Sequence, residues 1–303
     1  MMKAVQFSEY GDPHVLEFVE VEEPHAGPGQ VRIAVSAAGI NGIDWKLRAG
    51  ELRDFMPLSL PSGTGIDAAG IVDELGDGVD DVALGDAVFG SGSATLAEHA
   101  VLTDWALLPE GLSFEEAAGY GVAVETAIRI LDQIGVRPGQ TLLVSGASGG
   151  VGSAVVQIAR ERKINLIGTA SEKNLSYVVA LGAVAVPYGP DLVARIRAVA
   201  PAGIDAALDI AGSGVVPDLI ELTGDATKVL SIADFSAPGY GALVSTDPVN
   251  RADAFREVAR LFSAGAFHLP VAQRYALTQA ADAHRDSATG HVAGRRVVTV
   301  SEK

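Results

Sequence analysis

The residues best suited to chemistry lie in one glycine-rich segment, SGASGGVGSAVVQIA (145–159). Gly146, Gly149 and Gly152 recur every third residue at the start of an apolar helical pattern, as in loops that bind the phosphates of a dinucleotide. The same letters also fit the G-x-S-x-G turn that exposes a nucleophilic serine, here Ser148. The neighbouring elements have to distinguish a phosphate-binding loop from a serine nucleophile.

The segments on either side of the loop favour the dinucleotide. A strand-like run, TLLVSG, precedes the loop, and a helix is predicted over 151–163. Amides at such a helix N-terminus bind a pyrophosphate with help from the helix dipole. Gly149 and Gly152 take the last two glycine positions of G-x-G-x-x-G, whereas Ala147 takes the first. The motif alone is therefore only moderately specific.

The next predicted strand, INLIGTA, indicates which dinucleotide binds. An acidic residue near the end of this strand commonly binds the ribose 2′-hydroxyl of NAD. Here Ser171 and Lys173 stand near that end, and a hydroxyl with a cation suits a 2′-phosphate. NADP is therefore favoured over NAD. Glu172 keeps NAD open, and Lys173 could simply be a solvated residue of a first helical turn.

A serine hydrolase is the remote alternative for the same loop. It would use Ser148 as nucleophile, with Asp209 and His284 following in the order that this fold class requires. Aspartates and histidines are common, so this order is weak evidence. The alternative also leaves Gly152 and the pair Ser171 and Lys173 unexplained.

The rhythm of the chain predicts two kinds of domain. Short strand-like runs separated by Gly, Pro and Asp fill the first third. A helical pattern over 114–135 follows, and strands then alternate with helices, which indicates a parallel sheet. The end of the chain returns to extended segments. We predict an α/β protein in which a Rossmann doubly wound sheet (118–265) is inserted into a β-rich domain (1–117 and 266–303).

Composition excludes several classes of function. The chain of 303 residues carries a formal charge of −16 without a block of Lys or Arg, so a nucleic-acid partner is not expected. No apolar run is long enough to span a bilayer and no secretory signal is evident, so a cytoplasmic protein without a membrane partner is expected. Cysteine is absent and the six histidines show no ligand spacing, so no metal site is predicted.

Several segments together resemble one family over essentially the whole chain. VSAAGINGIDWKLRAG, PSGTGIDAAGIVDELGDGV, GDAVFG, the glycine loop and AHRDSATGHVAGRRVV occur in the order seen in medium-chain dehydrogenases/reductases. The chain looks like the zinc-free quinone oxidoreductase branch, in which ASGGVGS replaces the usual glycine fingerprint. That substitution accounts for Ala147.

The resemblance implies a fold, a cofactor and a reaction. The β-rich domain would be a GroES-like catalytic domain, and the protein would be a homodimer that transfers hydride from NADPH to a small quinone or α,β-unsaturated carbonyl compound. The residues implied to bind NADP(H) are Gly149, Gly150 and Val151 at the pyrophosphate, Ser171, Lys173 and Tyr188 around the 2′-phosphate, and Ser231.

The resemblance also implies catalytic positions. Asn41 and Asp44 stand in the family's N-x-x-D segment, and Thr126 matches a threonine near the nicotinamide. Asn41 and Lys46 are the candidates for stabilising charge on the substrate oxygen. Lys46 could instead be an exposed lysine, Asn41 could shape a turn, and Thr126 could be a buried hydroxyl. No residue is an evident proton donor.

Departures from the wider superfamily exclude a zinc-dependent alcohol dehydrogenase. Those enzymes have a cysteine in the segment around Asn41 and a His-Glu pair around Thr64, where this chain reads GINGID and GTGID. The four-cysteine lobe has no counterpart. Some quinone reductases have a tyrosine in place of Lys46, which leaves the substrate open.

The sequence defines neither the residues of the substrate pocket nor whether the protein turns over a substrate. Trp45, Phe55 and Tyr240 could line a flat pocket, although aromatic residues are more often core. The glycine-rich segment 234–247 could contribute a loop. A protein that binds NADP without turnover, as a sensor or structural component, remains the alternative from another class.

Overall fold

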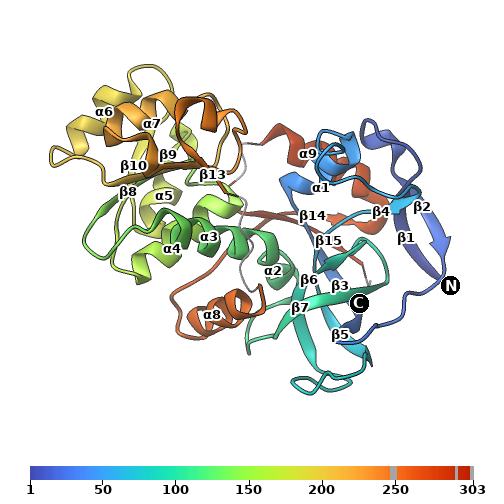
Figure 1. Cartoon of the computed structure of the whole chain (residues 1–303). Coiled ribbons are helices and arrows are strands. Elements are labelled where there is room, and N and C mark those ends of the chain that lie inside the picture. The colour runs from blue at the N-terminus through green and yellow to red at the C-terminus, as the bar shows by residue number, and fades with distance from the viewer. Residues whose placement is uncertain (246–250, 291–292, 301–303) are drawn as a thin grey trace. The chain divides into compact units, whose positions relative to one another are not determined.

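The computed structural model describes residues 1–245, 251–290 and 293–300. Contacts between Cα atoms divide this part of the chain into two compact units. Unit 1 contains residues 1–122, 251–290 and 295–300, and unit 2 contains residues 123–245 and 293–294. Figure 1 follows the chain through both units by colour.

Unit 1 is built on a mixed, mostly antiparallel sheet in the order β14-β15-β3-β5-β6-β7, with a further pairing of β3 and β7. That pairing closes β3, β5, β6 and β7 into a small barrel. Alternate residues of β3 face its interior, where Val31 and Ile33 are fully buried. The strands are β3 (Val31–Ile40), β5 (Asp67–Leu75), β6 (Ala87–Ser93), β7 (His99–Leu107), β14 (Val271–Ala276) and β15 (Arg295–Thr299).

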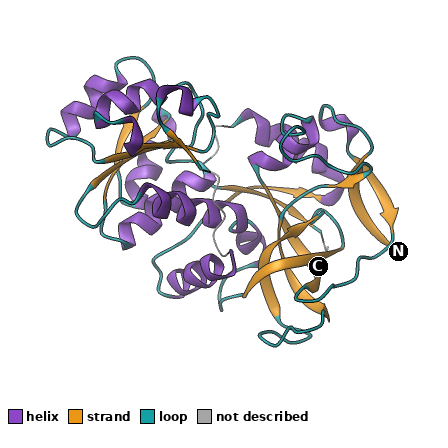
Figure 2. Ribbon diagram, in the orientation of Figure 1, coloured by secondary structure: helices purple, strands orange, loops and turns teal. Residues whose placement is uncertain are grey.

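A three-stranded sheet in the order β2-β1-β4 completes the strands of unit 1. Its members are β1 (Met2–Phe7), β2 (Glu17–Val21) and β4 (Ser62–Gly63), and a short 3-10 turn, η1 (Pro13–Val15), joins the first two. Helices α1 (Gly42–Ala49) and α9 (Ala280–Thr289) pack against each other, and the turn η5 (Leu277–Gln279) leads into α9. Figure 2 shows these strands and helices by type.

The helix predicted over 114–135 is broken in two. It forms α2 (Phe114–Ala118) and α3 (Gly121–Ile134), separated at Gly119 and Tyr120. The ring of Tyr120 is fully buried and packs edge-on against Phe89 and Phe267, with ring centroids 6.1 and 5.2 Å away. This tertiary contact, which periodicity does not reveal, accounts for the interruption.

Helix α8 (Arg251–Ser263) lies in unit 1, whereas the sequence analysis placed residues 118–265 in the Rossmann domain. The helix packs on β7 and β6, and its fully buried Phe255 contacts Phe89 at a centroid distance of 5.8 Å. The division between the units therefore falls before α8 rather than after it.

Unit 2 contains a six-stranded, fully parallel sheet in the order β10-β9-β8-β11-β12-β13. Counted from β8, this is the order 3-2-1-4-5-6 of the dinucleotide-binding fold, which confirms the predicted doubly wound sheet. The strands are β8 (Thr141–Ser145), β9 (Asn165–Ala170), β10 (Val184–Pro187), β11 (Ala206–Asp209), β12 (Val229–Ser231) and β13 (Leu243–Val244).

Helices cover both faces of this sheet (Figures 1 and 2). They are the main length of α3, α4 (Gly150–Glu161), α5 (Leu175–Leu181), α6 (Leu192–Val199) and α7 (Val216–Thr223), with 3-10 turns η2 (Glu172–Asn174), η3 (Ala226–Lys228) and η4 (Ala237–Tyr240). In both units, no helix among the described residues is long and apolar enough to cross a bilayer.

Candidate functional site

The glycine loop connects β8 to α4 in unit 2. Gly146 adopts a left-handed conformation, with φ of +86°, directly after the strand. The amide of Ala147 donates to the carbonyl oxygen of Thr169 at 3.0 Å, which ties the loop to β9. Gly149 caps α4 in an extended conformation, without a side-chain hydrogen bond. The opening amides of a helix have no acceptor inside the helix, so those of α4 remain available to an anion.

Two close approaches explain the residue types of this loop. A Cβ atom added at Gly152 would lie 2.1 Å from the carbonyl oxygen of Gly146, so only glycine lets α4 approach the loop. Ala147 is fully buried, and a Cβ atom added at Gly168 of β9 would lie 2.6 Å from the Cβ atom of Ala147. Ala147 fits at the first glycine position of the G-x-G-x-x-G motif because Gly168, on the neighbouring strand β9, leaves room for its Cβ atom.

Ser171 and Tyr188 lie at the same edge of the sheet as this loop. β9 and β10 are parallel with Ala170 opposite Pro187, and the amide of Tyr188 donates to the carbonyl oxygen of Ala170 at 3.2 Å. The hydroxyl of Ser171 is buried and has no hydrogen-bond partner among the described residues. Lys173, in η2, is exposed. Ser171 and Tyr188 thus directly follow two adjacent strand ends, and Lys173 comes two residues after Ser171.

The hydroxyl of Ser231, at the end of β12, is hydrogen-bonded within the protein. Its hydroxyl donates to Oδ2 of Asp209 at 2.8 Å and accepts the amides of Ala233 at 3.1 Å and Asp234 at 2.8 Å. The residue is fully buried. A hydroxyl with one proton and three such contacts holds the turn after β12 and has no proton left for a ligand.

Thr126, on α3, belongs to a polar group that the sequence analysis missed. Its hydroxyl donates to Oε2 of Glu125 at 3.3 Å and accepts from Nη2 of Arg129 at 3.4 Å. Glu125 and Arg129 form an ion pair at 2.8 Å, and Arg129 also donates to the hydroxyl of Ser245. The i,i+4 spacing of glutamate and arginine was the available signal.

In unit 1, α1 carries the residues of the predicted catalytic segment. Asn41 is its N-cap, and the amide of Asn41 donates to Oδ2 of Asp44 at 2.7 Å. Lys46 is half-buried, with its Nζ atom 5.7 Å from the ring centroid of Trp45. This places the ammonium group within cation–π distance of the indole. Phe55, in the loop after α1, is 83% exposed.

Phe55 and Tyr240 are exposed aromatic residues, so neither belongs to a core. Tyr240 lies in η4 of unit 2, within the segment 234–247 that was predicted as a loop. Residues 246 and 247 of that segment lie outside the described residues.

The side chain of Asn41 is held by two charged groups that the sequence analysis did not connect with it. Its Nδ2 atom donates to Oδ2 of Asp67 at 2.9 Å, and its Oδ1 atom accepts from Nη2 of Arg295. Asp67 also accepts the hydroxyl of Ser91 at 3.2 Å and the amide of Val122 at 2.9 Å. Asp67 could have been noticed in the sequence as a charged residue at the start of an otherwise apolar strand, DAAGIV.

Burial changes the acidity of this group. Asp44, Asp67 and Arg295 are all buried, and Nη2 of Arg295 lies 3.9 Å from Oδ2 of Asp67. Burial raises the pKa of Asp44 to about 7 and also raises the pKa of Asp67, while the nearby guanidinium opposes both shifts. Burial lowers the pKa of Arg295, against the attraction of the carboxylates. Desolvation disfavours every charge here.

No hydrogen bond among the described residues joins any two of Ser148, Asp209 and His284, the members of the serine-hydrolase alternative. Ser148 accepts a hydrogen bond from Nδ2 of Asn174 at 3.4 Å. His284, on α9, is fully buried, and neither of its ring nitrogens has a partner among the described residues. Burial lowers the pKa of His284 to about 3, with Arg48 adding to the shift. Asp209 is bonded to Ser231 and to the amide of Gly212.

The residues around Asn41 do not fit a zinc site. The chain has no cysteine, and the described residues contain no group of three or more His, Asp or Glu side chains that could hold a metal ion. The two carboxyl groups nearest Asn41 instead share their surroundings with the guanidinium of Arg295. Such a cation would oppose a bound divalent metal ion.

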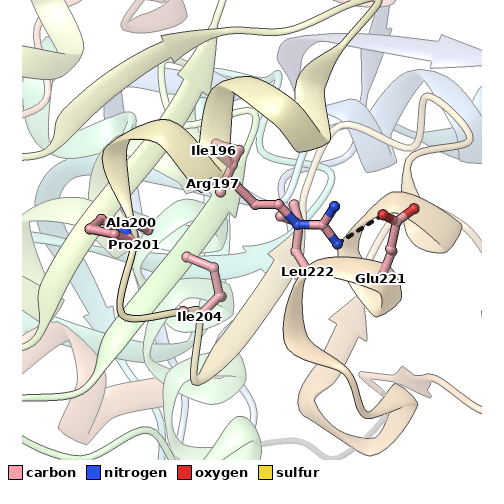
Figure 3. Close-up of a pocket in the computed structure, with 8 residues that line it drawn as sticks. Ile196, Arg197, Ala200, Pro201, Ile204, Glu221 and Leu222 are labelled. Atoms are coloured by element: carbon pink, nitrogen blue, oxygen red, sulfur yellow. Dashed lines mark ion pairs between the residues drawn. The ribbon is translucent and has the colours of Figure 1, made fainter.

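A hollow of about 340 Å³ in unit 2 lies between α6 and α7. Its lining includes Ile196 and Ile204, and Figure 3 shows the ion pair between Arg197 and Glu221, at 2.9 Å, among the lining residues. None of the predicted site residues lines this hollow, so it is not part of the candidate site.

Comparison with known proteins gives the same architecture. The family model described as alcohol dehydrogenase GroES-like domain matches residues 27–128, and the one described as zinc-binding dehydrogenase matches residues 181–298. A chloroplastic quinone oxidoreductase from Triphysaria versicolor is 30% identical over an alignment of 323 positions, gaps included, which covers 98% of this chain and 98% of that protein.

Solved structures agree in fold. A structure titled as an NAD-dependent alcohol dehydrogenase is 30% identical, with a TM-score of 0.87 over 99% of this chain and 100% of that one. The quinone oxidoreductase of Escherichia coli, complexed with NADPH, is 25% identical, with a TM-score of 0.86 over 98% and 100% of the two chains.

A GroES-like barrel joined to a Rossmann unit defines a class of nucleotide-dependent oxidoreductases. The chain belongs to the medium-chain dehydrogenase/reductase superfamily, in its quinone oxidoreductase-like branch. This confirms the resemblance inferred from the sequence motifs.

Proposed function

We propose that the protein is a zinc-independent reductase that uses NADPH to transfer hydride to a quinone or an α,β-unsaturated carbonyl compound. The observation that carries the proposal is the loop from Gly146 to Gly152, where close packing without Cβ atoms leaves the opening amides of α4 open to a pyrophosphate. We assign that contact to the amides of Gly150 and Val151. The amide of Gly149 donates to the carbonyl oxygen of Gly146 at 3.2 Å, so Gly149 contributes as the N-cap of α4.

The hydroxyl of Ser171, for which the described residues supply no hydrogen-bond partner, supports NADP rather than NAD. A buried hydroxyl without a partner is unfavourable, and a 2′-phosphate oxygen would satisfy it. Lys173 would supply the positive charge and Tyr188 a phenol at the same sheet edge. We assign Ser231 an indirect part, in which its internal bonds shape the turn that follows β12.

The chemistry of hydride transfer fits the polar groups present. Reduced nicotinamide, when bound, supplies the hydride to an electrophilic carbon of the substrate. We propose that Asn41 or Lys46 donates a hydrogen bond to the oxygen on which negative charge develops. The remaining proton of Asn41 Nδ2 could serve, because its other proton is bonded to Asp67 and its Oδ1 atom to Arg295.

Thr126 is proposed to orient the carboxamide of the nicotinamide. Its hydroxyl proton points to Glu125, so the oxygen can accept a hydrogen bond from the carboxamide but has no proton to give. Glu125 and Arg129 would thus fix the direction of this contact.

The test is the loss of NADPH absorbance over a panel of quinones, enals, enones and saturated ketones. Turnover with quinones or conjugated carbonyl compounds, unchanged by a strong metal chelator, is the expected result. Loss of activity with the chelator would contradict the zinc-independent mechanism. Tight NADPH binding without turnover on the whole panel would favour a sensor or structural protein. A homodimer, proposed from the family, is tested by the molar mass in solution.

A further inference from the structure

A buried group of charged residues lies at the N-terminal end of α1, and the proposed reaction gives these charges no role. It consists of Asp44, Asp67 and Arg295, with the neutral side chain of Asn41 among them. The three ionisable residues are 2%, 0% and 7% exposed. Solvent therefore does little to stabilise a net charge at this position.

The number of charges is unbalanced. Two ionised carboxylates and one guanidinium would leave one uncompensated negative charge in the interior, which is strongly unfavourable. One proton shared by the carboxyl groups restores neutrality, as it does when like charges occupy one site. The group is therefore neutral when one of the two carboxyls keeps its proton.

The hydrogen bonds indicate which carboxyl that is. Asp67 accepts from Asn41, Ser91 and the amide of Val122, and all of these contacts favour an ionised carboxylate. Asp44 accepts the amide of Asn41 through Oδ2 at 2.7 Å, and its buried Oδ1 atom has no hydrogen-bond partner among the described residues.

We propose that Asp44 carries a proton on Oδ1 in the working protein, and that this proton keeps Arg295 bonded to Asn41. Asp44 is thus a positioning residue for Asn41, and the activity readout of this inference rests on the proposed function. Loss of the proton to solvent would create a second carboxylate that competes for Arg295. The carboxamide of Asn41 would then lose the donor that fixes its Oδ1 atom.

The charged groups that act on Asp44 come from two strands. They are Asp67 of β5 and Arg295 of β15. Helix α9 and the turn η1 pack against α1. Their titratable groups, His284 of α9 and Asp12 at the start of η1, interact with Arg48 of α1. Burial raises the pKa of Asp44 to about 7, so the proton is lost within an accessible pH range.

The first test compares wild type with Asp44→Asn, a neutral isostere, and uses unfolding equilibria that need no substrate. As the pH rises from about 4 to about 7, the unfolding constant of the wild type should increase close to tenfold per pH unit relative to that of the variant. Above about pH 7 the ratio of the two unfolding constants should stay constant. The control is Asp80→Asn, an exposed carboxylate of the same unit, which should follow the wild type. A pH-independent difference between wild type and Asp44→Asn would overturn the proposal.

Infrared spectra of the wild type provide a readout that does not depend on a variant folding. At about pH 6, where exposed carboxyls are ionised, the carbonyl band of one protonated buried carboxyl should be present, and it should vanish on titration above about pH 8. Absence of this band at about pH 6 would overturn the proposal.

The second test is the pH profile of kcat/KM with NADPH and the best substrate of the panel. The wild type should lose activity about tenfold per pH unit above about pH 7, whereas Asp44→Asn should show no such decline. An identical decline in both proteins would overturn the positioning role. If no substrate is turned over, the proposed function fails, while the unfolding and infrared measurements still decide whether Asp44 holds the proton.

Discussion

Both carboxylate oxygens of Asp67 accept the backbone amide of Val122, each at 2.9 Å. A residue of strand β5 thereby caps the start of α3, the helix on which Thr126 lies one turn further along. A Cβ atom added at Gly121 would lie 2.2 Å from Oδ1 of Asp67, so glycine is needed for this approach. The carboxylate also complements the positive end of the helix dipole.

Replacing Asp67 by Asn should therefore destabilise unit 1. The change leaves Arg295 without its carboxylate partner and turns an amide group toward the start of α3, and breaking such a buried pair costs about 3–5 kcal/mol. Urea unfolding followed by circular dichroism measures this loss. The matched control on the same strand is Asp73→Asn, whose side chain and partners Arg32 and His99 are partly exposed, with an expected cost of about 1 kcal/mol. Equal losses in the two variants would contradict the capping role.

Gly152→Ala should weaken both folding and cofactor binding. The new Cβ atom would meet the carbonyl oxygen of Gly146 at 2.1 Å, and overpacking of this kind costs about 1–3 kcal/mol. Displacement of the loop should also weaken NADPH binding by at least about tenfold, because the amides that bind pyrophosphate move with it. Gly239→Ala, where an added Cβ atom meets nothing within 4 Å, is the control. Unchanged NADPH affinity in Gly152→Ala would argue against the loop as the diphosphate site.

Lys173→Ala should discriminate between the two cofactors. Removal of a cation that faces the 2′-phosphate should raise the Kd for NADPH about tenfold, or about 1.4 kcal/mol, and leave the Kd for NADH within about twofold. Fluorescence titration of both nucleotides gives the ratio. Lys228→Ala, an exposed lysine on η3, serves as the control. Equal losses for NADPH and NADH would contradict the 2′-phosphate assignment.

His284 should make the protein sensitive to acid. Its folded-state pKa of about 3 lies below the ordinary value of 6.5, so its contribution to stability is present above about pH 6.5 and is lost as the pH falls toward 3. At about pH 5 this loss amounts to about 2 kcal/mol. His284→Gln should flatten that part of the unfolding profile, whereas His14→Gln, at an exposed position on η1, should retain it. A profile unchanged by His284→Gln would show that another group dominates.

Much of the fold was predictable because its signals are local. The strand, the glycine turn and the helix over 141–161 follow from letters next to one another, and alternating elements indicate a parallel sheet. The interruption at Tyr120 was missed because it depends on aromatic contacts with Phe89 and Phe267, which lie far away in sequence. Helix α8 was missed as a part of unit 1 for the same reason, since only the Phe255 contact reveals it.

The candidate site divides in the same way. The places of Gly149, Ser171 and Lys173 in the fold, at the start of α4 and directly after β9, were predictable from motifs, because local sequence sets these elements; their binding roles stay predictions. The partners of Asn41 could not, since Asp67 and Arg295 lie 26 and 254 positions away in the chain. The hydrogen bond of the Ser231 hydroxyl was equally unpredictable from sequence, because its acceptor Asp209 lies on another strand.

The sequence by itself determined the glycine turn, the order of strands and helices, and the family, because each rests on residue types and short spacings. Only the tertiary structure decided the environment of the charges. It buried Asp44 beside Asp67 and Arg295 and placed a hydrogen-bond partner at both ends of the Asn41 carboxamide. It gave the ring nitrogens of His284 no hydrogen-bond partner within the described part of the chain. Burial and long-range contacts set these properties, and neither can be read from neighbouring letters.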